Sequence, residues 1–168
     1  MSDELKDNLN SSLITHYSSL HFNDMGESER PAYTEAHAAA YPSEYLAGID
    51  LYNAGEFHAA HDAWEERWRD DCGAREKLFL QALIQSAVVF HHIEIGRRGA
   101  ARRMYGMAKE KFARLGAERF MSLDVRDYLS QLDRALRWLE EAADPRDVIA
   151  PEFTPPRIIL LPELMEYD

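Results

Sequence analysis

The chain has 168 residues, of which 46% are hydrophobic, and its formal net charge is −11. This length and composition predict a globular chain that buries a sizeable core. The negative charge argues against a general nucleic-acid binder and against electrostatic binding to a membrane surface, because both need basic patches. Cys72 is the only cysteine, which excludes an intrachain disulfide and favours a reducing, cytoplasmic location. We therefore expect neither a nucleic-acid nor a membrane partner.

Residues 1–40 are polar and mixed, and we expect them to form a partly disordered tail. Apolar residues between Leu13 and Leu20 follow a helical spacing, so a short docked helix is an alternative for that stretch. The opening residues have neither the basic region nor the apolar region of a secretory signal, and no such signal is expected.

Residues 41–143 are expected to form one helical bundle domain. Pro42 suits the first turn of a helix, Gly55 is a candidate left-handed cap, Gly116 ends the fourth helix, and Asp124 is a candidate N-cap of the fifth. The helices are expected over residues 42–52, 56–70, 74–95, 99–115 and 124–143. The third of these is apolar on nearly every side, which is typical of a central helix.

No stretch of the sequence alternates convincingly as a β-strand, so the predicted fold class is all-α. Residues 144–168 are proline-rich and contain the apolar run from Ile158 to Leu161. We expect this segment to pack on the bundle as an extended tail. The prediction is thus a single bundle of about five helices with extended N- and C-terminal tails.

A longer ordered pattern runs from Leu51 to Leu115. Its first part is Tyr52, Asn53, Gly55, Phe57, His61, Asp62, Trp64, Glu65, Trp68 and Arg69, and its second part is Leu80, Gln81, Leu83, Ile84, Gln85, His91, His92, Gly96, Gly99 and Ala100. In this order and spacing the pattern resembles the domain-of-unknown-function family 309. The resemblance implies a small all-helical protein of bacteria or archaea, and it implies no reaction. Three positions depart from the usual pattern, namely Asp62, Ala82 and Arg97, where Glu, Gly and Asn are common.

Polar side chains occupy positions on the two central helices where a core would normally be apolar. His61 and Glu65 are four residues apart and face the same way, while three polar residues of the next helix lie within about 40° of one another. The resulting candidate polar pocket consists of His61, Glu65, Trp68, Gln81, Gln85 and His92. Burying such groups unpaired costs about 1–3 kcal/mol each. We therefore expect a network in which His61 bonds to Glu65 or to a glutamine across the helix pair. Which of the two adjacent histidines, His91 or His92, faces this network stays open.

The same residues offer an alternative, which is a divalent metal site. Metal ions such as zinc need three or four donors at about 2.0–2.2 Å. The candidate ligands are His58, His61, Glu65 and His92. Asp62 lies among them and Gln85 could add a further donor, but the Glu-x-x-His pairs of di-metal bundle sites are missing.

Two functions follow from these alternatives. The leading hypothesis is a non-catalytic binding or interaction protein whose His/Glu/Gln network is buried structure or a small polar pocket. The alternative is a metal-dependent, hydrolase-like enzyme that uses the same residues, since a histidine beside a carboxylate can act as a general base. No Ser, Cys or Thr lies in a recognisable nucleophile motif. The identity of a small ligand and the formation of a homo-oligomer stay open.

Two further groups of residues are interpreted as structural. Trp64 and Trp68 lie at helical spacing and are expected to form the aromatic core rather than a ligand pocket. Four arginines gather where the fourth helix begins, a position that can bind anions. They are Arg97, Arg98, Arg102 and Arg103. We interpret them as a solvated face that offsets the acidity of the chain.

Overall fold

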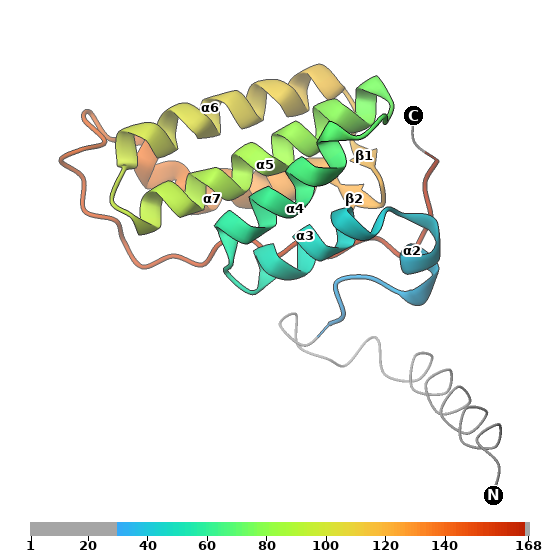
Figure 1. Cartoon of the computed structure of the whole chain (residues 1–168). Coiled ribbons are helices and arrows are strands. Elements are labelled where there is room, and N and C mark those ends of the chain that lie inside the picture. The colour runs from blue at the N-terminus through green and yellow to red at the C-terminus, as the bar shows by residue number, and fades with distance from the viewer. Residues whose placement is uncertain (1–29, 167–168) are drawn as a thin grey trace, which may run out of the picture. The chain divides into compact units, whose positions relative to one another are not determined.

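The structure is a computed structural model that describes residues 30–166, and those from Ala32 onward belong to one compact unit. The helix considered between Leu13 and Leu20 lies outside the described residues. The helices are α2 (Glu35–Ala40), α3 (Ser43–Asn53), α4 (Phe57–Arg69), α5 (Ala74–Glu94), α6 (Arg98–Leu115) and α7 (Val125–Glu141), as Figure 1 shows. A two-stranded antiparallel hairpin joins β1 (Arg119–Phe120) to β2 (Leu123–Asp124). The all-α class and the five long helices are confirmed.

The helices begin and end at the capping residues predicted from the sequence. Gly55 follows α3 with φ of 80° and Gly116 follows α6 with φ of 62°. Only glycine adopts this left-handed conformation without steric cost, so each residue ends its helix cleanly. The side chain of Asp124 accepts a hydrogen bond of 2.9 Å from the amide of Asp127 and caps α7.

The β-hairpin was not predicted from the sequence. Each strand has two residues, which is too short for an alternating pattern, and the turn residues Met121 and Ser122 adopt φ of 46° and 60°. Two positive φ angles in a two-residue turn match the twist of paired strands. Ser122 is buried, and its hydroxyl donates to the carbonyl of Glu163 at 2.5 Å and lies 2.6 Å from the hydroxyl of Tyr41. Burial and polar contacts therefore hold this turn.

Helix α2 lies in a stretch that was expected to belong to the polar tail. Thr34 caps it, and the fully buried His37 joins it to Leu161 in the C-terminal segment. The Thr34 amide donates to Nδ1 of His37 at 2.9 Å, so Nε2 carries the proton and donates to the Leu161 carbonyl at 2.8 Å. The sequence does not predict the role of this histidine, because its partner Leu161 is 124 residues away.

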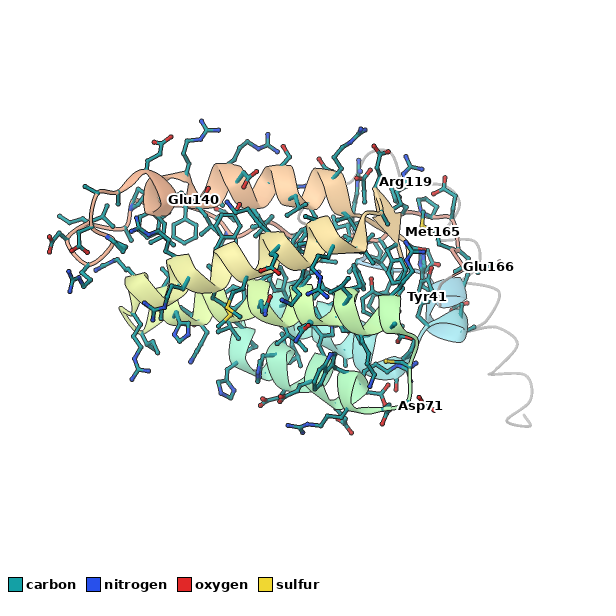
Figure 2. The ribbon with its side chains drawn as sticks, turned by 90° about the horizontal axis from the view of Figure 1, so that it is seen from above. Tyr41, Asp71, Arg119, Glu140, Met165 and Glu166 are labelled. Atoms are coloured by element: carbon teal, nitrogen blue, oxygen red, sulfur yellow. The ribbon has the colours of Figure 1, made fainter. Side chains whose placement is uncertain are left out.

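The C-terminal segment runs without helix or strand along the bundle and ends near α2, so that Tyr41 and Met165 lie together (Figures 1 and 2). Ile158 and Leu160 are buried in the core. The side-chain amide of Asn53 both donates to the carbonyl and accepts from the amide of Ile158, each at 2.8 Å. This paired contact at the end of α3 fixes the segment where its apolar side chains enter the core.

Helix α5 lies between α4 and α6, and α7 covers the other side of the core (Figure 1). The burial of α5 on several faces explains why its sequence is apolar nearly all round. Tyr52 packs against Phe90 of α5 and against Trp64 and Tyr128, with ring centroids 6.0 to 6.3 Å apart. Each such side chain contributes roughly 1.5–3 kcal/mol by leaving water. Helix α4 is therefore held firmly and presents its outer face in a fixed position.

Candidate functional site: the histidine–carboxylate face of α4

Trp64 anchors α4 to α3. The indole is fully buried and donates from Nε1 to the Tyr45 carbonyl at 3.0 Å. It packs directly on Gly48, where an added Cβ would lie 2.1 Å from Nε1. Phe57 and Ala60 point into the same core. Trp64 is thus a core residue, as the sequence indicated, and its position turns the intervening polar residues outward.

The outer face of α4 gathers nitrogen and oxygen donors, and we call His58, His61, Asp62 and Glu65 the donor face. Potential ligand atoms of His61, Asp62 and Glu65 lie within 4.8 Å of one another. The His61 and Asp62 side chains lie 2.9 Å apart, and Nδ1 of His58 lies 3.3 Å from the same carboxylate. The side chains of His58 and Asp62 are exposed and those of His61 and Glu65 are half-buried, so the face is partly open to solvent. Positions i, i+3, i+4 and i+7 of a helix produce this convergence.

Histidines of α5 border the donor face. The ring of His91 packs against His58 in a T-shaped contact with centroids 5.1 Å apart, and His92 lies beside His91 at 6.2 Å. Burial, together with His91 and two arginines, lowers the pKa of His92 from its ordinary value. His92 is therefore neutral at neutral pH. His91 thus contacts α4 through the ring of His58.

The hydrogen-bonded network expected from the sequence has a different form. Among the described residues, His61 bonds to Asp62, while Glu65 pairs with Arg69 at 3.1 Å. Gln85 is buried, yet neither its Oε1 nor Nδ1 of His92 has a hydrogen-bond partner within residues 30–166. No bond links these two groups to the donor face. His61 and Glu65 have their polar partners, Asp62 and Arg69, on α4 itself. They therefore need no partner on α5.

The remaining members of the predicted pocket, Gln81 and Trp68, are half-buried. Trp68 packs on the edge of the core, and the ammonium group of Lys77 lies 5.7 Å from its ring centroid. Such a contact stabilises by about 0.5–1 kcal/mol where it is exposed. Gln81 makes no hydrogen bond to another described side chain. Neither residue therefore joins His61 and Glu65 in one polar site. Trp68 contributes to the packing of α4 on α5, and Gln81 forms no hydrogen bond to the donor face.

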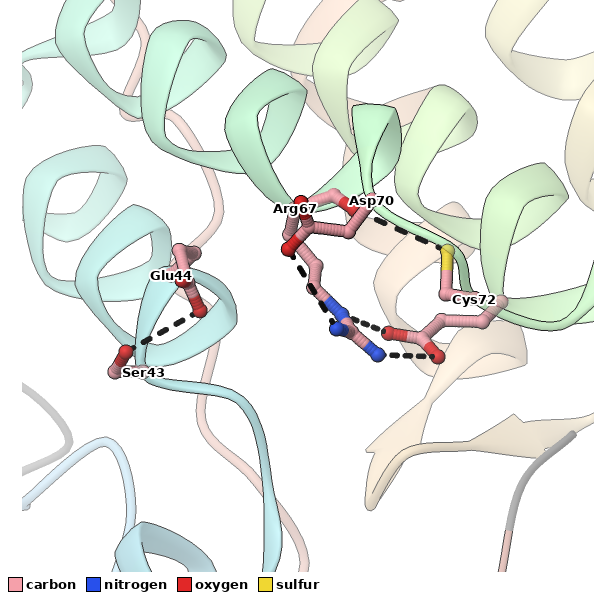
Figure 3. Close-up of polar contacts among 6 residues, drawn as sticks. Ser43, Glu44, Arg67, Asp70 and Cys72 are labelled. Carbon is pink, nitrogen blue, oxygen red and sulfur yellow. Dashed lines mark hydrogen bonds and ion pairs between the residues drawn. The ribbon is translucent and has the colours of Figure 1, made fainter.

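Sequence reasoning missed the strongest polar contact of α4. Arg67 donates to Glu76 of α5 from two nitrogens, at 2.7 and 3.2 Å, and Glu76 is only 2% exposed (Figure 3). Asp70 approaches the same guanidinium at 3.8 Å, and the Cys72 thiol contacts the Arg67 carbonyl. Burial raises the pKa of this thiol, which keeps it protonated. No sequence spacing signals the pair, because the angle between α4 and α5 decides whether the two side chains meet.

The fold and these contacts define a small all-helical domain whose central pair, α4 and α5, is joined by a buried ion pair and carries an open donor face. None of the described helices combines the length and apolar character that a membrane span needs. Residues 45–104 match the family described as Domain of unknown function (DUF309), so the chain contains a DUF309 domain that runs from the first turn of α3 through α4 and α5 into the first turns of α6. The resemblance drawn from the sequence is confirmed. No curated protein is significantly similar to the chain.

Proposed function

We propose that this chain is a non-catalytic binding protein and that its donor face binds a divalent transition-metal ion through His61, Asp62 and Glu65. The observation that carries the proposal is the approach of three potential ligand atoms to within 4.8 Å of one another. Imidazole and carboxylate donors suit zinc and neighbouring metals. Around a tetrahedral ion with bonds of about 2.1 Å, ligand atoms are roughly 3.4 Å apart. Small side-chain rotations would close the remaining gap.

A fourth donor supports binding rather than catalysis. The His58 imidazole lies 3.3 Å from Asp62 and is 66% exposed, so it can rotate toward the same ion. Closed sites with four protein ligands hold a metal without leaving a position for substrate, whereas catalytic zinc sites keep one position for water. The donor face would then serve metal storage, transfer or sensing.

The metal-dependent hydrolase is the second candidate. It is favoured by one observation, which is that His58 lies outside the group of three converging donors while its ring packs on His91. If His58 stays there, water occupies the fourth metal position, and bound water with a pKa near 7 is a nucleophile. Substituting His58 distinguishes the candidates.

The test is calorimetric titration of metal-free protein with zinc. We expect one ion per chain, binding weakened at least about tenfold by Glu65→Gln, and no change in Glu66→Gln. Glu66 is a matched control, because it is exposed on the same helix and makes no ion pair among residues 30–166. Zinc binding that is absent, or equal in both variants, would contradict the proposal.

Cobalt replaces zinc as a spectroscopic probe of the coordination. A four-ligand site predicts that His58→Ala weakens binding and changes the visible spectrum. If His58→Ala leaves affinity and spectrum unchanged while the metal-loaded chain hydrolyses an activated ester, the second candidate is correct. We also propose a cytoplasmic location, since the sole cysteine, Cys72, suits a reducing compartment.

A further inference from the structure

A cleft lies on the molecule where the start of α6 meets the segment that follows α7. Its volume is approximately 370 Å³, and it is lined by Gly99, Arg102, Arg103, Ala143, Asp144, Pro145 and Arg146. Three of these residues are arginines and one is an aspartate, so the lining is net positive. This is unusual for a chain whose net charge is −11. From this cleft we infer a binding site for a small phosphate monoester.

The arginines are arranged so that many donors stay available. Arg102 uses Nη1 to donate to the Ala142 carbonyl at 2.7 Å, which ties α6 to the end of α7. Arg146 uses Nε and Nη2 to bind Asp144. A guanidinium has five N–H donors, so each retains several for a ligand. Arg103 is exposed and has no acidic partner in the described part of the chain.

Asp144 occupies the place that an anion would take. It accepts from the amide and the side chain of Arg146, and this contact lowers its pKa to about 2. A carboxylate so placed orients Arg146 when no ligand is bound. It also repels an incoming anion, so its charge reduces affinity.

Gly99 leaves room for a ligand to approach the backbone. Among the described atoms, a Cβ at this position would meet only Nη1 of Arg103, at 3.8 Å, so the glycine is not required by packing. The N-cap of α6, Arg97, lies two residues before Gly99 and provides no side-chain hydrogen bond to the first turn of the helix. The Gly99 amide can therefore add a hydrogen bond to a phosphate that the arginines hold.

The size and lining of the cleft favour an ester over a bare ion. A cleft of this volume falls within the range of small-molecule sites. Ala143 and Pro145 add apolar surface next to the arginines. A planar guanidinium matches phosphate in a bidentate manner, and the carbon skeleton would lie on the apolar side.

The experiment titrates the full chain, freed of metal on a chelating resin, with inorganic phosphate and with ribose 5-phosphate at constant ionic strength. Changes in the amide resonances of α6 report binding, and chloride is the reference anion. We expect saturable shifts for both phosphates, centred on Gly99, and tighter binding of the ester. Equal effects of phosphate and chloride would overturn the inference, and an ester that binds no better than phosphate would overturn the assignment to monoesters.

Four variants sharpen the test without disturbing the fold. Arg103→Gln should weaken binding about tenfold, whereas Arg134→Gln, which removes the same charge from an exposed site on α7, should not. Asp144→Asn should bind several-fold more tightly, because the amide still accepts from Arg146 but no longer repels the ligand. Gly99→Ala should weaken binding. Equal affinities of Arg103→Gln and Arg134→Gln, or weaker binding by Asp144→Asn, would contradict the site.

Discussion

The polar residues at the two ends of α4 differ in burial and in the partners they have. Toward the C-terminal end, Arg67 is held by the buried Glu76 through two hydrogen bonds. Toward the N-terminal end, His58, His61 and Asp62 share contacts on an open surface. A buried charge needs a partner that stays in place, because losing it leaves an uncompensated charge in the protein. An exposed donor pays no such penalty and is free to exchange a weak contact for a ligand.

The largest effect is expected from breaking the buried pair. Glu76→Ala removes the two carboxylate oxygens that accept from Arg67. It should lower the free energy of unfolding by about 3 kcal/mol, the low end of the 3–5 kcal/mol typical of a broken buried pair, since Asp70 still lies 3.8 Å from the guanidinium and Arg67 keeps some contact with solvent. Urea unfolding measures the change. Arg69→Ala is the control, because Arg69 is exposed and its ion pair with the half-buried Glu65 should contribute less than about 0.5 kcal/mol. Similar losses in the two variants would show that burial does not distinguish the two pairs.

The next largest effect on stability is expected from the packing of α3 against α4, which holds both ends of α4 in place. Gly48→Ala places a Cβ where the Trp64 indole lies, and such overpacking should cost about 1–3 kcal/mol in unfolding free energy. Gly106→Ala lies on the exposed side of α6, where an added Cβ meets no atom of the described residues within 4 Å. It should instead be neutral or stabilise by up to about 1 kcal/mol. If both substitutions behave alike in thermal unfolding, close packing of α3 on α4 is not what fixes the donor face.

A smaller effect is expected from His92 at the border of the donor face. Its pKa is lowered in the folded chain, mainly by burial and then by His91, Arg97 and Arg103. The unfolded chain therefore binds the proton more readily, and this contribution to stability is present above the ordinary histidine pKa of about 6.5 and is lost as pH falls below it. Replacing His92 by Gln should reduce the loss of unfolding free energy between pH 7.5 and pH 5.5. An unchanged pH dependence would show that the loss arises from other groups.

The sequence predicts the helices well because their signals are local. Gly55, Gly116 and Asp124 end or begin helices through contacts within a few residues, and the structure places them there. The hairpin at Met121 and Ser122 left no such signal, since its two-residue strands are fixed by contacts with distant residues.

The candidate site was predicted only in part for the same reason. Helical spacing brings His61 and Glu65 to one face, and Asp62 joins them. Whether a polar residue of α5 meets them depends on the angle and rotation of two helices, which the spacing does not contain. Gln85 and His92 consequently do not bond to the donor face, while the contact between Arg67 and Glu76 went unseen.

The smallest effect on stability is expected within the donor face itself. Glu65→Gln and His61→Ala remove contacts with partners that are exposed, Arg69 and Asp62, and should change the unfolding free energy by less than about 0.5 kcal/mol in the absence of metal. Urea unfolding in metal-free buffer checks this. A loss of 2 kcal/mol or more would show that the donor face supports the fold.

The central claim is that the donor face of α4 binds a ligand, whereas the ion pair between Arg67 and Glu76 at the C-terminal end of α4 stabilises the fold. It is tested most directly by the thermal unfolding midpoint of the purified chain before and after zinc is added, in the wild type and in Glu65→Gln. A ligand at one hundred times its dissociation constant adds about 2.7 kcal/mol to the folded state. We predict that zinc raises the midpoint of the wild type and leaves that of Glu65→Gln much less changed. Equal midpoints with and without zinc in the wild type would contradict the account.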